Sequence, residues 1–236
     1  MKSLKMPVLS LRPLILAAIV ALVSASSFAQ DSLNFLTDGK PDAATLLAPP
    51  PLPDSPEQTA DIDEVRAVFH SASSNDMAAA YSEKRFSVFN FAEAVGPFFT
   101  PANLPKTAAF FRKIQMDAAI VTDLGKDHFK RPRPFVIDPA LANGKLETSF
   151  SYPSGHSTES MVLALVLADL LPEKHDAIIA HARMMGWHRV EIARHYPTDI
   201  YAGRVLAIAI VKQFKKNDTF EKEFEAVKAE LAAAQK

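Results

Sequence analysis

Three short polar clusters in the second half of the chain carry the side chains that could do chemistry. They run over Lys126–Pro134, Ser151–His156 and His188–Asp199. Together they offer cations for phosphate oxygens, two histidines, and an aspartate four residues after His195. A carboxylate on one ring nitrogen of a histidine leaves the other nitrogen free to attack phosphorus, while cations stabilise the oxyanions. The clusters therefore indicate a phosphoryl-transfer site.

The first cluster is the basic one. Its Lys126 and Arg133 lie seven residues apart, a spacing that returns to nearly the same face of a helix after two turns. Pro132 and Pro134 instead predict an extended and rigid end. A rigid arginine suits a fork of hydrogen bonds to phosphate oxygens, although a basic loop by itself is more often simply solvated.

The second cluster has the pattern of a helix start. Pro153 stiffens the approach, Ser154 can cap the helix, and Gly155 lets a ligand come close to the backbone. The first turn of a helix offers unpaired N–H groups and a positive dipole end, which bind anions. A bound phosphate would raise the pKa of His156 and keep it protonated as a general acid. Alone, the pattern also fits an ordinary capped helix beside a surface histidine.

The third cluster pairs a histidine with an aspartate. His195 and Asp199 are four residues apart, although Pro197 interrupts simple helical geometry between them. The aspartate can hold the ring and stabilise the charge that develops during attack. Arg189 precedes the pair by nearly two helical turns and can supply another oxyanion contact. Taken separately, such a pair is also a common structural hydrogen bond.

The elements that must position these clusters are helices. Apolar residues recur at three- and four-residue steps from Ile62 onward, and no stretch shows the alternation of a strand. Thr198 can cap the helix that follows the third cluster. We therefore predict an all-α fold, a single-domain helical bundle over residues 61–236. Its clearest helices are expected at residues 105–123, 155–171, 173–194, 198–215 and 219–236.

The N-terminal part is predicted to consist of a signal peptide, residues 1–29, and a Pro-rich arm, residues 30–60. The first thirty residues combine a basic region, an apolar stretch and a small-x-small cleavage site. The apolar stretch has about ten residues, whereas a membrane span needs about 20. The arm favours an extended conformation and is either a flexible leader or a strap across the domain.

The overall composition excludes several classes. The formal net charge is −1, which gives no broad basic surface for nucleic acid. The chain has no cysteine, so the fold uses no disulfides even though an exported location would permit them. No stretch after the signal peptide approaches the length and apolarity of a membrane span, so we expect no integral membrane span in the mature chain.

Taken together, the clusters match a known signature: K-x6-R-P, P-S-G-H and R-x5-H-x3-D. The chain thereby resembles the type 2 phosphatidic acid phosphatase and vanadium haloperoxidase superfamily. Within it, the chain most resembles the class A bacterial non-specific acid phosphatases. That resemblance covers nearly all of the mature chain and includes Leu46–Pro51, Asp54-Ser55, Arg133–Phe135 and Ser151–His156.

The resemblance implies a role for each matching residue. It makes His195 the nucleophile that forms a phosphohistidine and Asp199 its orienting carboxylate. It makes His156 the acid that protonates the leaving alcohol and then activates water. It implies no metal and no cofactor. It also implies a phosphate-binding cradle of Lys126, Arg133, Ser154, Gly155 and Arg189.

The chain departs from the family pattern at two positions. His188 stands where the family usually has a serine before the arginine, and Phe150 replaces a usual glycine before Ser151. The first change can alter the cradle or its pH dependence. The second can reshape the loop. Neither removes a group with an implied catalytic role.

The function that follows is a periplasmic, metal-independent acid phosphatase of broad specificity acting on small phosphate esters. Two alternatives share the superfamily: a vanadate-dependent haloperoxidase, because vanadate and phosphate are near-isosteres, and a lipid or diphosphate phosphatase. A phosphate-binding protein with poor turnover is a third alternative. The proline-rich arm makes a homo-oligomer conceivable, and the sequence names no physiological substrate.

Overall fold

The computed structural model describes residues 33–235, so the predicted signal peptide lies outside the described residues. Within that range the regular structure is helical and no strand occurs, which confirms the predicted all-α fold. The helices are α1 (Ala43–Leu46), α2 (Pro56–Ser71), α3 (Ser74–Ser82), α4 (Ala92–Val95), α5 (Pro105–Phe129), α6 (Pro134–Ile137), α7 (Gly155–Leu170), α8 (His175–Glu191), α9 (Pro197–Phe214) and α10 (Asp218–Ala234), with short 3₁₀ turns between some of them.

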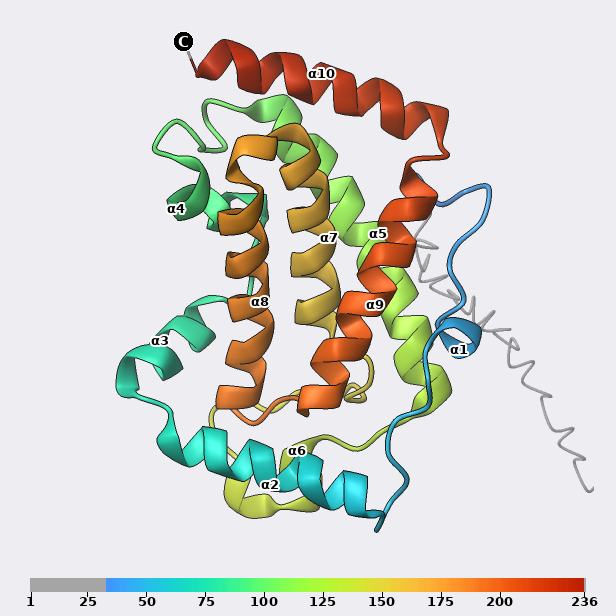
Figure 1. Cartoon of the computed structure of the whole chain (residues 1–236), viewed down its shortest axis with the longest axis vertical. Helices are drawn as coiled ribbons and strands as arrows, with labels where there is room; N and C mark the ends of the chain where they lie inside the picture. Colours follow the sequence, from blue (N-terminus) through green and yellow to red (C-terminus); the bar gives the residue numbers. More distant parts are fainter. Residues whose placement is uncertain (1–32, 236) are drawn as a thin grey trace, which may run out of the picture. The chain divides into compact units, whose positions relative to one another are not determined.

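Helix α7 is the centre of the bundle because it is apolar nearly all round. Twelve of its 16 residues are buried, as expected of a helix that packs on several sides. It packs against α8, α9 and α5, which surround it in Figure 1. No helix within residues 33–235 is both long and apolar enough to span a bilayer.

Helix α5 carries the first cluster and extends beyond its predicted range of 105–123. It continues to Phe129 and stops where Lys130 adopts a left-handed conformation, with φ of 51°. Pro132 follows at once and cannot continue a helix. The extension places Lys126 in the last turn of α5, while Arg133 lies outside it, as the N-cap of α6.

Helix α9 begins one residue earlier than predicted. Pro197 occupies its first position and Tyr196 is the N-cap, so the predicted cap at Thr198 is wrong. Proline favours this position because the first N–H of a helix has no partner in any case. Further along, Gly203 lets α9 approach the start of α7, since a Cβ there would lie 2.9 Å from the Ser154 carbonyl oxygen.

The proline-rich segment packs on the bundle from residue 33 onward. The backbone N–H groups of Asn34 and Phe35 donate to the buried Asp117 carboxylate at 2.8 and 2.7 Å. The Tyr152 hydroxyl donates to the Ala48 carbonyl at 2.6 Å. Helix α2 already begins at Pro56, within the predicted arm, and Ser55 caps it. The described part of the arm therefore lies against the helical body.

The antiparallel order of the long helices brings the three clusters to one end of the bundle. The starts of α7 and α9 and the ends of α5 and α8 meet there, toward the bottom of Figure 1. Helix α2 crosses the same end and contacts α8 and α9, while α3 packs on α8. Residues far apart in sequence thus surround one polar site.

Candidate active site

The direction of the hydrogen bonds around His195 fixes its tautomer. Arg133 Nη1 lies 3.2 Å from His195 Nε2, and a guanidinium can only donate, so Nε2 accepts and carries no proton. Nδ1 therefore carries the proton and donates to Asp199 Oδ2 at 3.2 Å. The ring has its lone pair on Nε2, on the side of Arg133.

The Asp199 carboxylate is fully buried and each of its oxygens has defined donors. Oδ1 accepts from Arg131 Nη1 at 2.6 Å. Oδ2 accepts from His195, from the Ser151 hydroxyl, and from the Tyr196 N–H at 3.0 Å. Burial opposes the charged form, but these hydrogen bonds and the Arg131 charge together lower the pKa of Asp199 below its ordinary value. Asp199 is therefore an anion in the folded protein.

The surroundings keep the His195 ring neutral. Burial is the largest cause, and the charge of Arg133 adds to it, so that the pKa of His195 is lowered to about 3 despite the neighbouring Asp199. An unprotonated imidazole is the form that can attack phosphorus.

His156 lies in the first turn of α7 in a different environment. Its Nε2–H donates to the Glu83 carbonyl at 3.2 Å, and its ring lies 5.3 Å from that of Phe86. Burial and then the charge of Arg189 lower the pKa of His156 to about 3. His156 is thus neutral while no anion is bound, and a phosphate dianion would oppose the cations and favour its protonated form.

The hydrogen bonding of the Arg189 side chain, in the third cluster, is incomplete within residues 33–235. Arg189 donates one Nη to the Ala80 carbonyl, while its buried Nε has no hydrogen-bond partner within residues 33–235. A buried charged donor without a partner is costly. An oxyanion beside it would satisfy the group.

The other predicted cradle residues lie around the start of α7. Lys126 Nζ is 2.9 Å from Asp123 Oδ1, and a Cβ on Gly155 would lie only 3.4 Å from that Nζ. Ser154 is buried and accepts the Ser157 N–H at 3.4 Å as the N-cap of α7. Arg133 is more engaged than predicted, since it also donates to the backbone carbonyls of residues 149 and 194.

The site contains residues that the motif analysis did not assign. Arg131 and Ser151 bind Asp199 directly, and Glu83 reaches the site from the end of α3. Both Arg131 and Ser151 lie within the polar clusters, where a search for partners of Asp199 could have found them. Glu83 gives no such signal, because only the packing of α3 on α8 brings it close.

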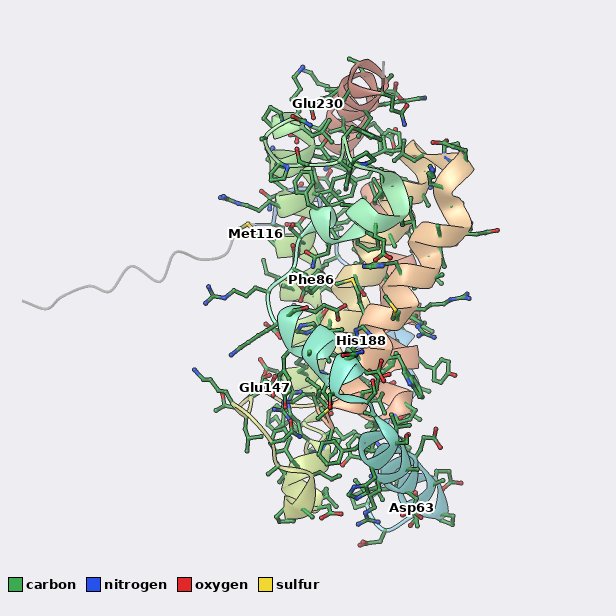
Figure 2. All side chains as sticks on the ribbon, turned by 90° about the vertical axis from the view of Figure 1, so that its left-hand side faces the viewer. Asp63, Phe86, Met116, Glu147, His188 and Glu230 are labelled. Atoms are coloured by element: carbon green, nitrogen blue, oxygen red, sulfur yellow. The ribbon has the colours of Figure 1, made fainter. Side chains whose placement is uncertain are left out.

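The two departures from the family pattern differ in consequence. His188 is buried, and its Nδ1 lies 2.8 Å from Glu83 Oε2. Burial opposes the charged form, but the hydrogen bond and charge of Glu83 outweigh it and raise the pKa of His188. Figure 2, which looks onto α3, shows His188 and Phe86 near this helix. Phe150, in contrast, is exposed.

Within residues 33–235 no group of three or more histidine, aspartate or glutamate side chains is arranged to hold a metal ion. The charges of Arg133 and Lys126 act on His195, and those of Arg189 and Lys126 act on His156.

Comparisons with known proteins agree with the geometry. Residues 114–218 match the model of the PAP2 superfamily. A non-specific acid phosphatase from Providencia stuartii is 32% identical over 152 residues, which cover 62% of this chain and 61% of that protein. The chain thus spans about three fifths of that relative's length. A lipid A 1-phosphatase from Rhizobium etli is 38% identical over 77 residues, 33% of this chain and 32% of that protein.

A solved structure shares the fold. It is a transmembrane PAP2-type phosphatidylglycerolphosphate phosphatase from Bacillus subtilis, with a TM-score of 0.51 and 20% identity, covering 74% of this chain and 89% of that one. The family-model match, residues 114–218, includes all three polar clusters. Residues 114–218 thus match a PAP2 superfamily domain in sequence, and the described chain shares the helical fold of a PAP2-type phosphatase.

Proposed function

We propose that the chain is an exported acid phosphatase that hydrolyses phosphate monoesters through a phosphohistidine at His195, without a metal ion. The supporting observation is the hydrogen-bond direction around His195, which leaves the lone pair on Nε2 and the proton on Nδ1. The family match and the relatives named as acid phosphatases support the same class of reaction.

In the first step, His195 Nε2 attacks phosphorus and the bond to the leaving oxygen breaks. Asp199 stabilises the positive charge that develops on the ring. Lys126 and Arg189, whose Nε has no hydrogen-bond partner in the described part of the chain, bind the phosphoryl oxygens. Arg133 already donates to the attacking nitrogen, so it must shift its N–H toward a phosphoryl oxygen as the substrate enters.

In the second step, His156 changes from acid to base. The bound phosphate first favours its protonated form, so that it can give the proton to the leaving alcohol. The neutral ring then takes a proton from water, which attacks the phosphohistidine and releases phosphate. We expect a rate optimum at mildly acid to neutral pH, because His195 must be neutral while His156 must be protonated in the complex.

The test is hydrolysis of p-nitrophenyl phosphate by the mature protein in excess EDTA. We expect turnover in the wild type and in His175→Ala, an exposed histidine away from the site, and none above background in His195→Ala. Turnover that EDTA abolishes would contradict metal independence. No turnover in the wild type, with peroxidase activity on added vanadate, would favour the haloperoxidase.

Lipid phosphates are a second substrate class that one observation favours. The match to the lipid A 1-phosphatase covers 77 residues. A comparison of kcat/KM for a short-chain phosphatidic acid and for glycerol phosphate distinguishes the classes. We expect the soluble ester to be hydrolysed at least as well, and a strong preference for the lipid would overturn that expectation.

Export is tested separately by cell fractionation. We expect the processed chain in the periplasm, with its N-terminus near Gln30. Retention of the unprocessed chain in the cytosol would contradict this part of the proposal.

A further inference from the structure

Arg131 forms the centre of a buried network behind the nucleophile. Its Nη1 donates to Asp199 Oδ1 at 2.6 Å and to Thr198 Oγ1 at 2.7 Å. Its Nη2 donates to Asp61 Oδ2 and to Gln58 Oε1, both at 2.7 Å. The guanidinium thus joins two carboxylates that come from α9 and α2, which are far apart in the sequence.

The network is almost completely shielded from water. Arg131 and Asp61 each have only 5% of their surface exposed, and Asp199 has none. The guanidinium carbon also lies 3.8 Å from the centre of the Tyr196 ring, a favourable cation–π arrangement. A buried charge set of this kind is stable only if every member keeps its partner.

The geometry divides the oxygens of Asp199 between two tasks. Oδ1 is held by Arg131, while Oδ2 faces the His195 ring. Without the guanidinium, the carboxylate can rotate and Oδ1 would be a buried acceptor without a donor. Asp61 in turn fixes Arg131, and it also accepts hydrogen bonds from the N–H and hydroxyl of Thr198 in the first turn of α9.

We propose that Arg131, anchored by Asp61 of α2, is a positioning residue that holds Asp199 in the orientation required to direct the His195 lone pair at phosphorus. The proposal rests on His195 being the nucleophile. It gives α2 a role in the reaction although this helix contributes no residue to the phosphate cradle. Arg131 acts through Asp199 and does not itself touch the phosphate.

The first measurement separates positioning from phosphate binding. In Arg131→Met we expect kcat for p-nitrophenyl phosphate to fall on the order of 10- to 100-fold, by analogy with the loss of partners that orient metal-binding side chains. The Kd for inorganic phosphate, measured by calorimetry, should stay within about twofold, because Lys126 and Arg189 remain. Arg131→Lys should recover part of kcat, since an ammonium can bind one carboxylate.

The matched control is Asp117→Asn. Asp117 is a fully buried aspartate that holds the N-terminal segment through three hydrogen bonds and lies outside the site. We expect this variant to lose stability and keep its kcat. If Arg131→Met lowers kcat no more than the control does, or lowers phosphate affinity by the same factor as kcat, the proposal is wrong.

A second pair of variants covers the possibility that Arg131→Met does not fold. Asp61→Asn keeps the arginine and removes only its anchor charge, while Asp61→Asn/Arg131→Met removes both charges and leaves no orphaned carboxylate at position 61. We expect kcat to fall in both variants, and to fall less in Asp61→Asn than in Asp61→Asn/Arg131→Met. Wild-type kcat in both folded variants would overturn the proposal.

A readout independent of turnover is the ¹⁵N spectrum of His195 in the full mature chain. We expect the Nδ1–H tautomer in both proteins, because Arg133 still donates to Nε2, but a shifted Nδ1 signal in Arg131→Met, where the hydrogen bond to a reoriented Asp199 is weakened. An unchanged Nδ1 signal would contradict the proposal. Because this spectrum requires no substrate, an inactive wild type would disprove the proposed function while the spectrum still decides the role of Arg131.

Discussion

The two histidines of the site are held in contrasting ways. His195 lies between an arginine and an aspartate, and that aspartate is itself bound by Arg131 and Ser151. His156 meets a backbone carbonyl and the ring of Phe86. In the proposed mechanism, the nucleophile side is thus oriented before substrate arrives, whereas the acid side gains its working protonation state only when phosphate brings negative charge.

The contrast assigns different tasks to different helices. The starts of α9 and α2, with the segment after α5, build the nucleophile side, while α3, α7 and α8 build the acid side. An ionic network gives a fixed direction, which attack on phosphorus requires. A histidine against a carbonyl keeps more freedom to change its proton twice per turnover.

The largest expected effect comes from breaking the nucleophile side at its centre. Asp199→Asn keeps the size of the side chain but removes the charge that stabilises the imidazolium. We expect kcat to fall on the order of 10⁴-fold, as in a serine protease triad. Steady-state kinetics measure this loss of kcat. The affinity for inorganic phosphate is measured as the control. A kcat within tenfold of the wild type would show that the two sides do not differ as described.

Removing the proposed acid, His156, should lower the hydrolysis rate by a smaller factor, and that factor should depend on the leaving group. In His156→Ala we expect glycerol phosphate hydrolysis to fall by about 10²- to 10⁴-fold, a typical range for general acid catalysis. For p-nitrophenyl phosphate the loss should be smaller, because p-nitrophenolate leaves without a proton. Equal losses for both esters would mean that His156 is no proton donor.

A milder change sharpens the description of the nucleophile side. Ser151→Ala removes one donor to the buried Asp199 Oδ2 and leaves the others. We expect the free energy of unfolding to decrease by about 1.5–3 kcal/mol, the usual range for a hydrogen bond to a charged group, and kcat to fall modestly. Denaturant unfolding measures the change in the free energy of unfolding. An unchanged value would contradict the hydrogen bond from Ser151 to Asp199.

The smallest expected effect concerns the ion pair of the acid side, His188–Glu83. Because the folded-state pKa of His188 is raised, the pair stabilises the fold fully below about pH 6.5, the unfolded value, and this contribution is lost as pH rises through the folded value. Glu83→Gln should therefore lower Tm at pH 5 and have little effect at pH 9. Thermal melts at both pH values test this, and an equal loss at both would contradict it.

The sequence predicted the helical class and the polar clusters because both depend on local patterns. Apolar residues at helical spacing indicated α7 and α9, and the motif letters indicated His195 and Asp199. The ends of helices were less predictable: α5 continues to Phe129, and α9 starts at Pro197 with Tyr196 as its cap. The choice of cap depends on local geometry that several neighbouring residues could satisfy.

The parts of the site that could not be predicted all depend on long-range packing. Glu83 joins His156 and His188 only because α3 packs on α8, and Asp61 reaches Arg131 only because α2 crosses the end of the bundle. These partners are far apart in the sequence, and no helical or strand spacing links them, so the sequence pattern does not indicate the contacts. The sequence marks His188 as an unusual residue, but its contact with Glu83 depends on the packing of α3 on α8.

The most direct test of the central claim is to trap the phosphorylated protein. The mature chain is mixed with ³²P-labelled substrate, quenched in alkali, in which phosphohistidine is stable, and digested for peptide mapping. We predict label on the peptide that contains His195, and none in His195→Ala. Label on another residue, or turnover by the wild type without any labelled protein, would contradict the account.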